Sequence, residues 1–170
     1  RGIFACLSCG SDAASSRASL ALARRWPFVW AAAGIHPHEA SQAGEEDFAE
    51  IGKMLREDKV RALGEAGLDF HYDFSPRDTQ ERVLLRQLDM AYEAGFPIVL
   101  HVREAHGAML DILNRRAGRL PGGVLHCFSG SAESAAEYQR LGFHISFAGS
   151  VTFRNAGKLR MAAQAVRAER

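Results

Sequence analysis

The chain has few cysteines, little net charge and no long apolar run. It contains 170 residues, of which three are cysteines, and its formal net charge is +1 at pH 7. An odd number of cysteines argues against a disulfide framework, and so small a charge gives no overall field that would attract nucleic acid or a membrane surface. No apolar run reaches the length of a membrane-spanning helix, and no basic segment followed by an apolar one opens the chain. We therefore expect a globular protein without membrane association, with the cytoplasm as its default compartment.

Two of the cysteines, Cys6 and Cys9, have the C-x-x-C spacing in the segment CLSC. Such a pair can form a redox centre or one half of a zinc site. A zinc site would need more ligands of this kind, and the sequence has no second C-x-x-C motif. Because residues three apart on a strand face opposite sides, we favour two buried, small apolar side chains.

Short apolar runs alternate with amphipathic stretches along the whole chain, without a linker, a low-complexity tract or a hairpin signal. The composition, 47% hydrophobic and 24% charged, is that of a globular domain. Six apolar runs begin at Gly2, Phe28, Val60, Phe96, Gly122 and Phe143, and helical patterns cover 11–25, 48–55, 77–94, 105–112, 131–141 and a last segment from about Asn155. This alternation predicts a parallel α/β fold.

The spacing of the runs favours a barrel. Comparable strand ends are separated by 20 to 36 residues, and a barrel of eight β/α units in about 250 residues has roughly 31 residues per unit. An open doubly wound sheet is the alternative, but the polar residues fall at successive strand ends and not at one switch point. We predict one domain over residues 1–170, an incomplete (β/α)8 TIM barrel of the metal-dependent hydrolase type with about six β/α units.

A carboxylate lies inside one of the apolar runs, where an unpaired charge would be costly. Glu65 follows Gly64 in the segment LGEAGLDF, and histidines end the neighbouring runs at His36, His101 and His126. A single histidine on an apolar run is more often a core residue, but strand ends meet at the mouth of a barrel. One carboxylate and two imidazoles suit Zn²⁺ or Mn²⁺. We expect a cation beside Glu65, with the flanking glycines leaving room for it.

Several motifs together resemble the TatD family of metal-dependent deoxyribonucleases. These motifs are GIHPHEA, GEAGLDFHYDFSPRDTQ, PIVLHVREAHGAMLDIL, GVLHCFSGS and GFHISFAGSVTFRNAGKLR, in this order over essentially the whole chain. The resemblance implies a β/α barrel with two divalent ions (Mg²⁺, Mn²⁺ or Zn²⁺) at the strand ends. It also implies two-metal hydrolysis of phosphodiester bonds at DNA or RNA ends, carried out by a protein that we expect to be a monomer.

The resemblance also assigns roles residue by residue. Glu65 matches the carboxylate that bridges both ions, and His101 and His126 match the remaining ligands of the second ion. His36 and Arg103 match residues that line the catalytic site. His71 and Tyr72 follow the Val60 run and either line the mouth or lie in a loop.

Two segments of the family pattern have no counterpart in these 170 residues. They are a His-x-His after the first strand and an Asp in a Thr-Asp-Ser-Pro-like segment, which together hold the first ion. Since the chain also starts with Arg, we expect it to be part of a longer protein that carries the activity. Fold and ligands do not fix the substrate, so two alternatives stay open: hydrolysis of an ester or amide such as D-aminoacyl-tRNA, and a catalytically inactive fragment.

Overall fold

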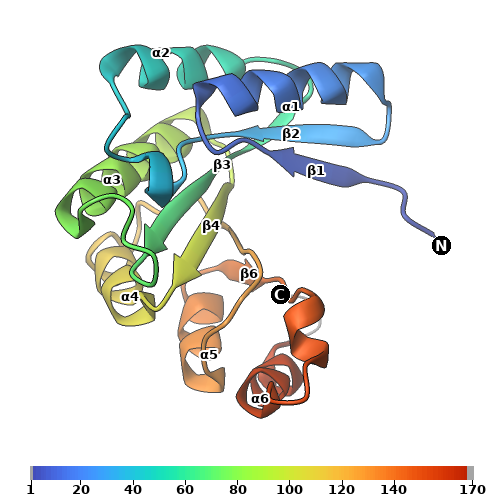
Figure 1. Cartoon of the computed structure of the whole chain (residues 1–170), viewed down its shortest axis with the longest axis vertical. Coiled ribbons are helices and arrows are strands. Elements are labelled where there is room, and N and C mark those ends of the chain that lie inside the picture. The colour runs from blue at the N-terminus through green and yellow to red at the C-terminus, as the bar shows by residue number, and fades with distance from the viewer. Residues whose placement is uncertain (1, 168–170) are drawn as a thin grey trace.

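The structure is a computed structural model that describes residues 2–167, and it contains a single six-stranded sheet (Figure 1). The strands are β1 (Cys6–Cys9), β2 (Val29–Ala33), β3 (Val60–Asp69), β4 (Ile98–Arg103), β5 (Gly123–Leu125) and β6 (Phe143–Ile145). Each strand pairs in parallel with the next one along the chain, so the order across the sheet equals the order in the sequence. This order is that of a barrel wall.

Helices alternate with the strands along the chain and pack around the curved sheet, and the last helix follows β6 (Figure 1). They are α1 (Ala13–Arg25), α2 (Glu45–Met54), α3 (Arg77–Ala94), α4 (His106–Arg115), α5 (Ala132–Arg140) and α6 (Gly157–Ala165), with 3-10 turns η1 (Pro37–Glu39) and η2 (Gly149–Thr152). The predicted alternation of strands and helices is therefore confirmed.

Local signals fix where the helices begin and end. The Asp12 side chain accepts a hydrogen bond from the backbone N–H of Ser15 and so caps α1. Ser131 and Ser134 form the equivalent capping box at α5. Helix α3 ends at Gly95, which adopts a left-handed conformation (φ 69°) just after its last residue.

The two faces of the sheet carry different side chains. The main core lies between the sheet and the helices, and its largest buried side chains include Leu63, Leu84, Leu100 and Tyr138. The opposite face holds a small separate cluster of Ala32, Ala62 and Val99, with Val124 packed against it. A main core between the sheet and its helices, with a second apolar cluster on the opposite face, fits an incomplete TIM barrel, as the sequence predicted.

The prediction that Cys6 and Cys9 are buried is wrong. Both thiols are free, and both residues are exposed. Within residues 2–167, β1 pairs only with β2, so its side chains have neighbouring strand residues on one side only. Apolar composition alone does not reveal which strand lies at a sheet edge.

No helix within residues 2–167 has both the length and the apolar character needed to cross a lipid bilayer.

Candidate metal centre

Four consecutive strands of the sheet bring the predicted site residues to one place. Glu65 lies in the middle of β3 and His101 in β4, while His36 follows β2 and His126 follows β5 directly. All these strands are parallel, so their carboxyl ends meet at the same edge. The four side chains that were predicted from distant motifs therefore form one cluster.

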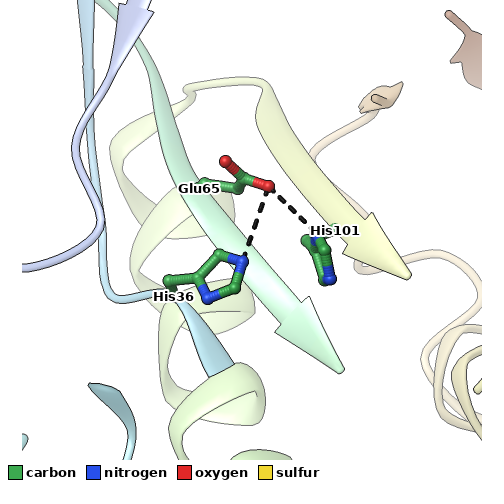
Figure 2. Close-up of side chains that lie close together, drawn as sticks. All are labelled: His36, Glu65 and His101. Carbon is green, nitrogen blue, oxygen red and sulfur yellow. Dashed lines mark hydrogen bonds and ion pairs between the residues drawn. The ribbon is translucent and has the colours of Figure 1, made fainter. Parts of the chain in front are cut away.

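One oxygen atom is the centre of this cluster. The Oε1 atom of Glu65 lies 3.1 Å from Nδ1 of His101 and 3.7 Å from Nε2 of His36 (Figure 2). The Nε2 atom of His126 approaches the same oxygen to 2.5 Å. His36, Glu65 and His101 can each offer one ligand atom, with all three atoms within 4.8 Å of one another. One carboxylate oxygen with imidazole nitrogens is a donor set that suits Zn²⁺ and Mn²⁺, so the residues fit a divalent cation.

Asp69 adds a second carboxylate that the sequence did not assign to the site. Its side chain is 1% exposed, and its Oδ2 atom lies 3.0 Å from Nε2 of His101 and 2.9 Å from Nε2 of His38. His101 therefore lies between two carboxylates, with one ring nitrogen toward each. The signal in the sequence was the spacing: Asp69 follows Glu65 by four residues, so both point to the same face of β3.

The surroundings lower the pKa values of both carboxyl groups. Burial raises the pKa of the Glu65 carboxyl, but hydrogen bonds from His101 and His126 outweigh burial and hold the pKa well below its usual range. Burial is likewise outweighed at Asp69, where hydrogen bonds from the Tyr72 backbone and the histidines lower the pKa to about 2. The cluster thus keeps two negative charges at neutral pH, as a cation site requires.

The surroundings shift the pKa values of the two central histidines in opposite directions. Burial and the neighbouring His101 ring together lower the pKa of His36 to about 4, so His36 is neutral at pH 7 with a free electron pair. Burial also acts on His101, but hydrogen bonds to Glu65 and Asp69 dominate and raise its pKa. Because a metal binds the neutral form of an imidazole, protons compete with a cation for His101.

The glycines beside Glu65 allow the close packing of β3 against β4. Gly64 (φ 141°) and Gly67 (φ 154°) both occupy backbone conformations that favour glycine. A Cβ atom at Gly67 would lie 1.9 Å from the backbone oxygen of His101, and one at Gly64 would lie 2.8 Å from Val99. The missing side chains let the β4 backbone approach β3, and this approach brings His101 to Glu65.

Two buried glutamines of α3 hold the backbone of the site. The Gln87 amide accepts from the N–H of Ile35 (2.8 Å) and donates to its carbonyl (2.9 Å), directly before His36. Gln80 makes the same pair with Asp69, at 2.8 and 3.1 Å. Because the two residues lie seven apart, they share one face of α3. One helix therefore fixes the segments after β2 and at the end of β3.

Arg103 also lies at this edge, two residues after His101 on β4 and hence on the same face. Its guanidinium lies over the ring of Tyr72, with 4.6 Å between Cζ and the ring centroid. The side chain is partly exposed. The predicted catalytic arginine is therefore next to the cluster, and its catalytic role stays a prediction.

A curved sheet of parallel β/α units with a carboxylate–histidine cluster at its carboxyl edge is typical of metal-dependent hydrolases of the TIM-barrel type. Comparison with known proteins narrows this class. The family model for TatD related DNase matches residues 1–170. The chain belongs to the TatD family, as the motifs predicted.

Individual relatives agree with this assignment. The chain is 40% identical over 149 residues to the uncharacterized metal-dependent hydrolase YabD of Bacillus subtilis, covering 88% of this chain and 58% of that protein. It is 38% identical over 150 residues to the 3'-5' ssDNA/RNA exonuclease TatD of Cronobacter sakazakii, covering 88% of this chain and 57% of the relative. The chain thus spans less than two thirds of these relatives.

A solved structure shows the same fold. The crystal structure of YjjV, a TatD homologue from Escherichia coli K12, superposes with a TM-score of 0.90 at 30% identity, covering 98% of this chain and 64% of that chain. A TatD family hydrolase from Entamoeba histolytica has the same fold, with a TM-score of 0.81 at 20% identity.

Proposed function

We propose that the protein hydrolyses phosphodiester bonds at the ends of DNA or RNA with the help of divalent cations held at Glu65. The observation that carries this proposal is the convergence of three imidazoles on one oxygen of Glu65. A buried carboxylate is stable in such a place when a cation accompanies it. The relatives named 3'-5' ssDNA/RNA exonucleases support nucleic acid as the substrate class.

We assign the ligands from the same geometry. Glu65, His101 and His126 would hold one ion, as the family resemblance implies, and the 3.7 Å distance from His36 to the Glu65 oxygen makes His36 a further candidate ligand. A bound divalent ion would polarise the phosphate and lower the pKa of water at the site. Mg²⁺, Mn²⁺ and Zn²⁺ are the candidates.

The other residues would bind and orient the substrate. The Arg103 guanidinium can form two parallel hydrogen bonds to a phosphate and balance its charge. The neutral His36 ring can accept a proton from a nearby donor. Asp69 would hold the rings of His38 and His101 in place through the hydrogen bonds described above.

An end-labelled single-stranded oligonucleotide, incubated with the full-length protein, tests this proposal. We expect shortened products with Mn²⁺ or Mg²⁺, none with a chelator, and a loss of at least about 100-fold for Glu65→Gln, since the variant loses a ligand and not just an outer contact. Glu93→Gln, at an exposed position of α3, is the matched control and should cleave normally. Release of an amino acid from aminoacyl-tRNA without any oligonucleotide cleavage would contradict the proposal.

A further inference from the structure

Two large aromatic rings lie exposed beside the candidate metal centre. Tyr72 and Phe74 follow β3, and they are 47% and 67% exposed. Their rings stack on one another, with centroids 5.2 Å apart and an angle of 23° between the planes. Such a pair offers a flat, rigid apolar surface at the edge of the site, at low conformational cost.

The position of this pair is fixed by the candidate centre itself. The His38 ring packs edge-on against both, with centroid distances of 5.6 Å to Tyr72 and 4.8 Å to Phe74. His38 in turn lies 2.9 Å from the Asp69 carboxylate. The other oxygen of Asp69 accepts hydrogen bonds from the backbone N–H groups of His71 (3.0 Å) and Tyr72 (2.9 Å). One buried carboxylate therefore connects the aromatic pair to His101.

An arginine side chain without an ion-pair partner among the described residues lies beside the two rings. The Arg103 guanidinium lies against the Tyr72 ring, and among residues 2–167 it has no hydrogen-bond or ion-pair partner. Arg77, at the start of α3, is by contrast paired with Asp73. Arg103 thus keeps its donors available for an anion next to a stacking surface.

We propose that Tyr72 and Phe74 form a stacking platform for an unpaired nucleobase of the substrate, and that Arg103 binds the adjoining phosphate. The proposal rests on the function proposed above, because it describes how that same site would select its substrate. A nucleotide carries an aromatic face and a phosphate a short distance apart, which matches the ring pair and the free guanidinium. Bases inside a duplex have both faces covered, so the platform would select single-stranded ends.

The test compares oligonucleotides with and without bases, using the full-length protein. One single-stranded oligonucleotide has normal nucleotides throughout, and two others lack the bases of the last three nucleotides at the 5' or the 3' end. Binding is measured by fluorescence anisotropy in the presence of a chelator, so that nothing is cleaved. Since stacking on an aromatic ring contributes about 1–3 kcal/mol per base, we expect the wild type to bind one of the abasic oligonucleotides roughly 10- to 100-fold more weakly.

Variants then show whether Tyr72 and Phe74 cause the preference for oligonucleotides that carry bases. The double variant Tyr72→Ala/Phe74→Ala should bind the normal and abasic oligonucleotides equally, whereas Tyr72→Phe should keep the wild-type preference because it keeps the ring. Tyr92→Ala is the matched control: Tyr92 is also exposed, also lies under an arginine, Arg119, and belongs to the last turns of α3, away from the site. It should behave as the wild type.

The outcomes separate this proposal from the proposed function. A preference for base-bearing ends that the double variant loses supports the platform, even when no cleavage follows on adding metal. A double variant that weakens binding of all oligonucleotides alike, or a wild type without preference, overturns it. Cleavage by a wild type without preference would leave the nuclease proposal intact and remove the platform.

Discussion

The side chain of Gln80 is joined to the backbone of Asp69 by two hydrogen bonds, one to its N–H and one to its carbonyl. Gln80 is 1% exposed, and its amide also donates to the carbonyl of Ser75 at 2.8 Å. A side chain of α3, on the outside of the sheet, therefore contacts the backbone at the edge where the candidate centre lies. This link gives the outer core a direct effect on the geometry of Asp69 and His101.

Replacing Gln80 or Gln87 with leucine should lower the free energy of unfolding by about 1–3 kcal/mol each, because buried backbone groups lose their partners. Urea denaturation followed by circular dichroism measures this loss. Gln80→Leu should also weaken divalent-metal binding about tenfold or more, since Asp69 loses its support. Gln164→Leu, at an exposed position of α6, should change neither quantity. Wild-type stability in both buried variants would refute the role assigned to the glutamines.

The close approach of β3 and β4 depends on Gly67. Gly67→Ala places a Cβ atom against the His101 carbonyl and forces a residue with a side chain into φ 154°. We expect a loss of more than about 3 kcal/mol in the free energy of unfolding, through both backbone strain and displacement of β4. Gly107→Ala is the control, because a Cβ atom there meets nothing within 4 Å and helix propensity favours alanine by about 0.5–1 kcal/mol. Equal melting temperatures for the two variants would contradict this explanation of Gly67.

His106 should make the fold sensitive to acid. Its Nδ1 atom lies 3.1 Å from the Tyr138 hydroxyl, its Nε2 atom is buried without a hydrogen-bond partner, and burial lowers its pKa to about 4. The unfolded chain, with a histidine pKa of about 6.5, binds more protons between these values. The stability that neutral His106 provides is therefore complete above pH 6.5 and is lost as the pH falls toward 4.

A comparison with His106→Gln isolates this effect, because all other titrating groups are shared. Between pH 7 and 4.5 the wild type should lose about 2 kcal/mol more free energy of unfolding than the variant. Denaturation curves at a series of pH values measure the difference. Parallel pH profiles for the two proteins would show that His106 does not titrate in this way.

The histidines of the candidate centre should differ in their importance for metal binding. His101→Ala should reduce Mn²⁺ or Zn²⁺ affinity most, since this ring contacts both Glu65 and Asp69, and His36→Ala and His126→Ala should each reduce it at least about tenfold. Isothermal titration calorimetry gives these affinities. His144→Ala, at an exposed position of β6, should bind as the wild type. A drop for His144→Ala as large as that for His101→Ala would mean that the ion lies elsewhere.

Much of the fold was predictable because each segment carries its own pattern. Helix α3 was predicted with the observed bounds, since its apolar stripe and Gly95 both mark its extent. The convergence of Glu65, His101 and His126 followed from the rule that parallel strand ends meet at one edge. These predictions depend on local periodicity and on topology, and both can be inferred from a single sequence.

The rest depends on contacts between distant segments. Nothing in the sequence indicates that the amide of Gln87 reaches Ile35, 52 residues away, or that Phe74 stacks on Tyr72 in the open. The glycines at 64 and 67 were recognised, but their reason lies in the path of β4, which only the structure gives. The exposure of Cys6 likewise depends on its place at a sheet edge.

The central claim is that the Glu65 carboxylate holds a divalent cation, and a crystal of the full-length protein grown with Mn²⁺ tests it directly. The account predicts an anomalous difference peak about 2.0–2.5 Å from a Glu65 oxygen and from an imidazole nitrogen of the cluster. A fully occupied Mn²⁺ at another place, with Glu65 still hydrogen-bonded to His101 and His126, would contradict it.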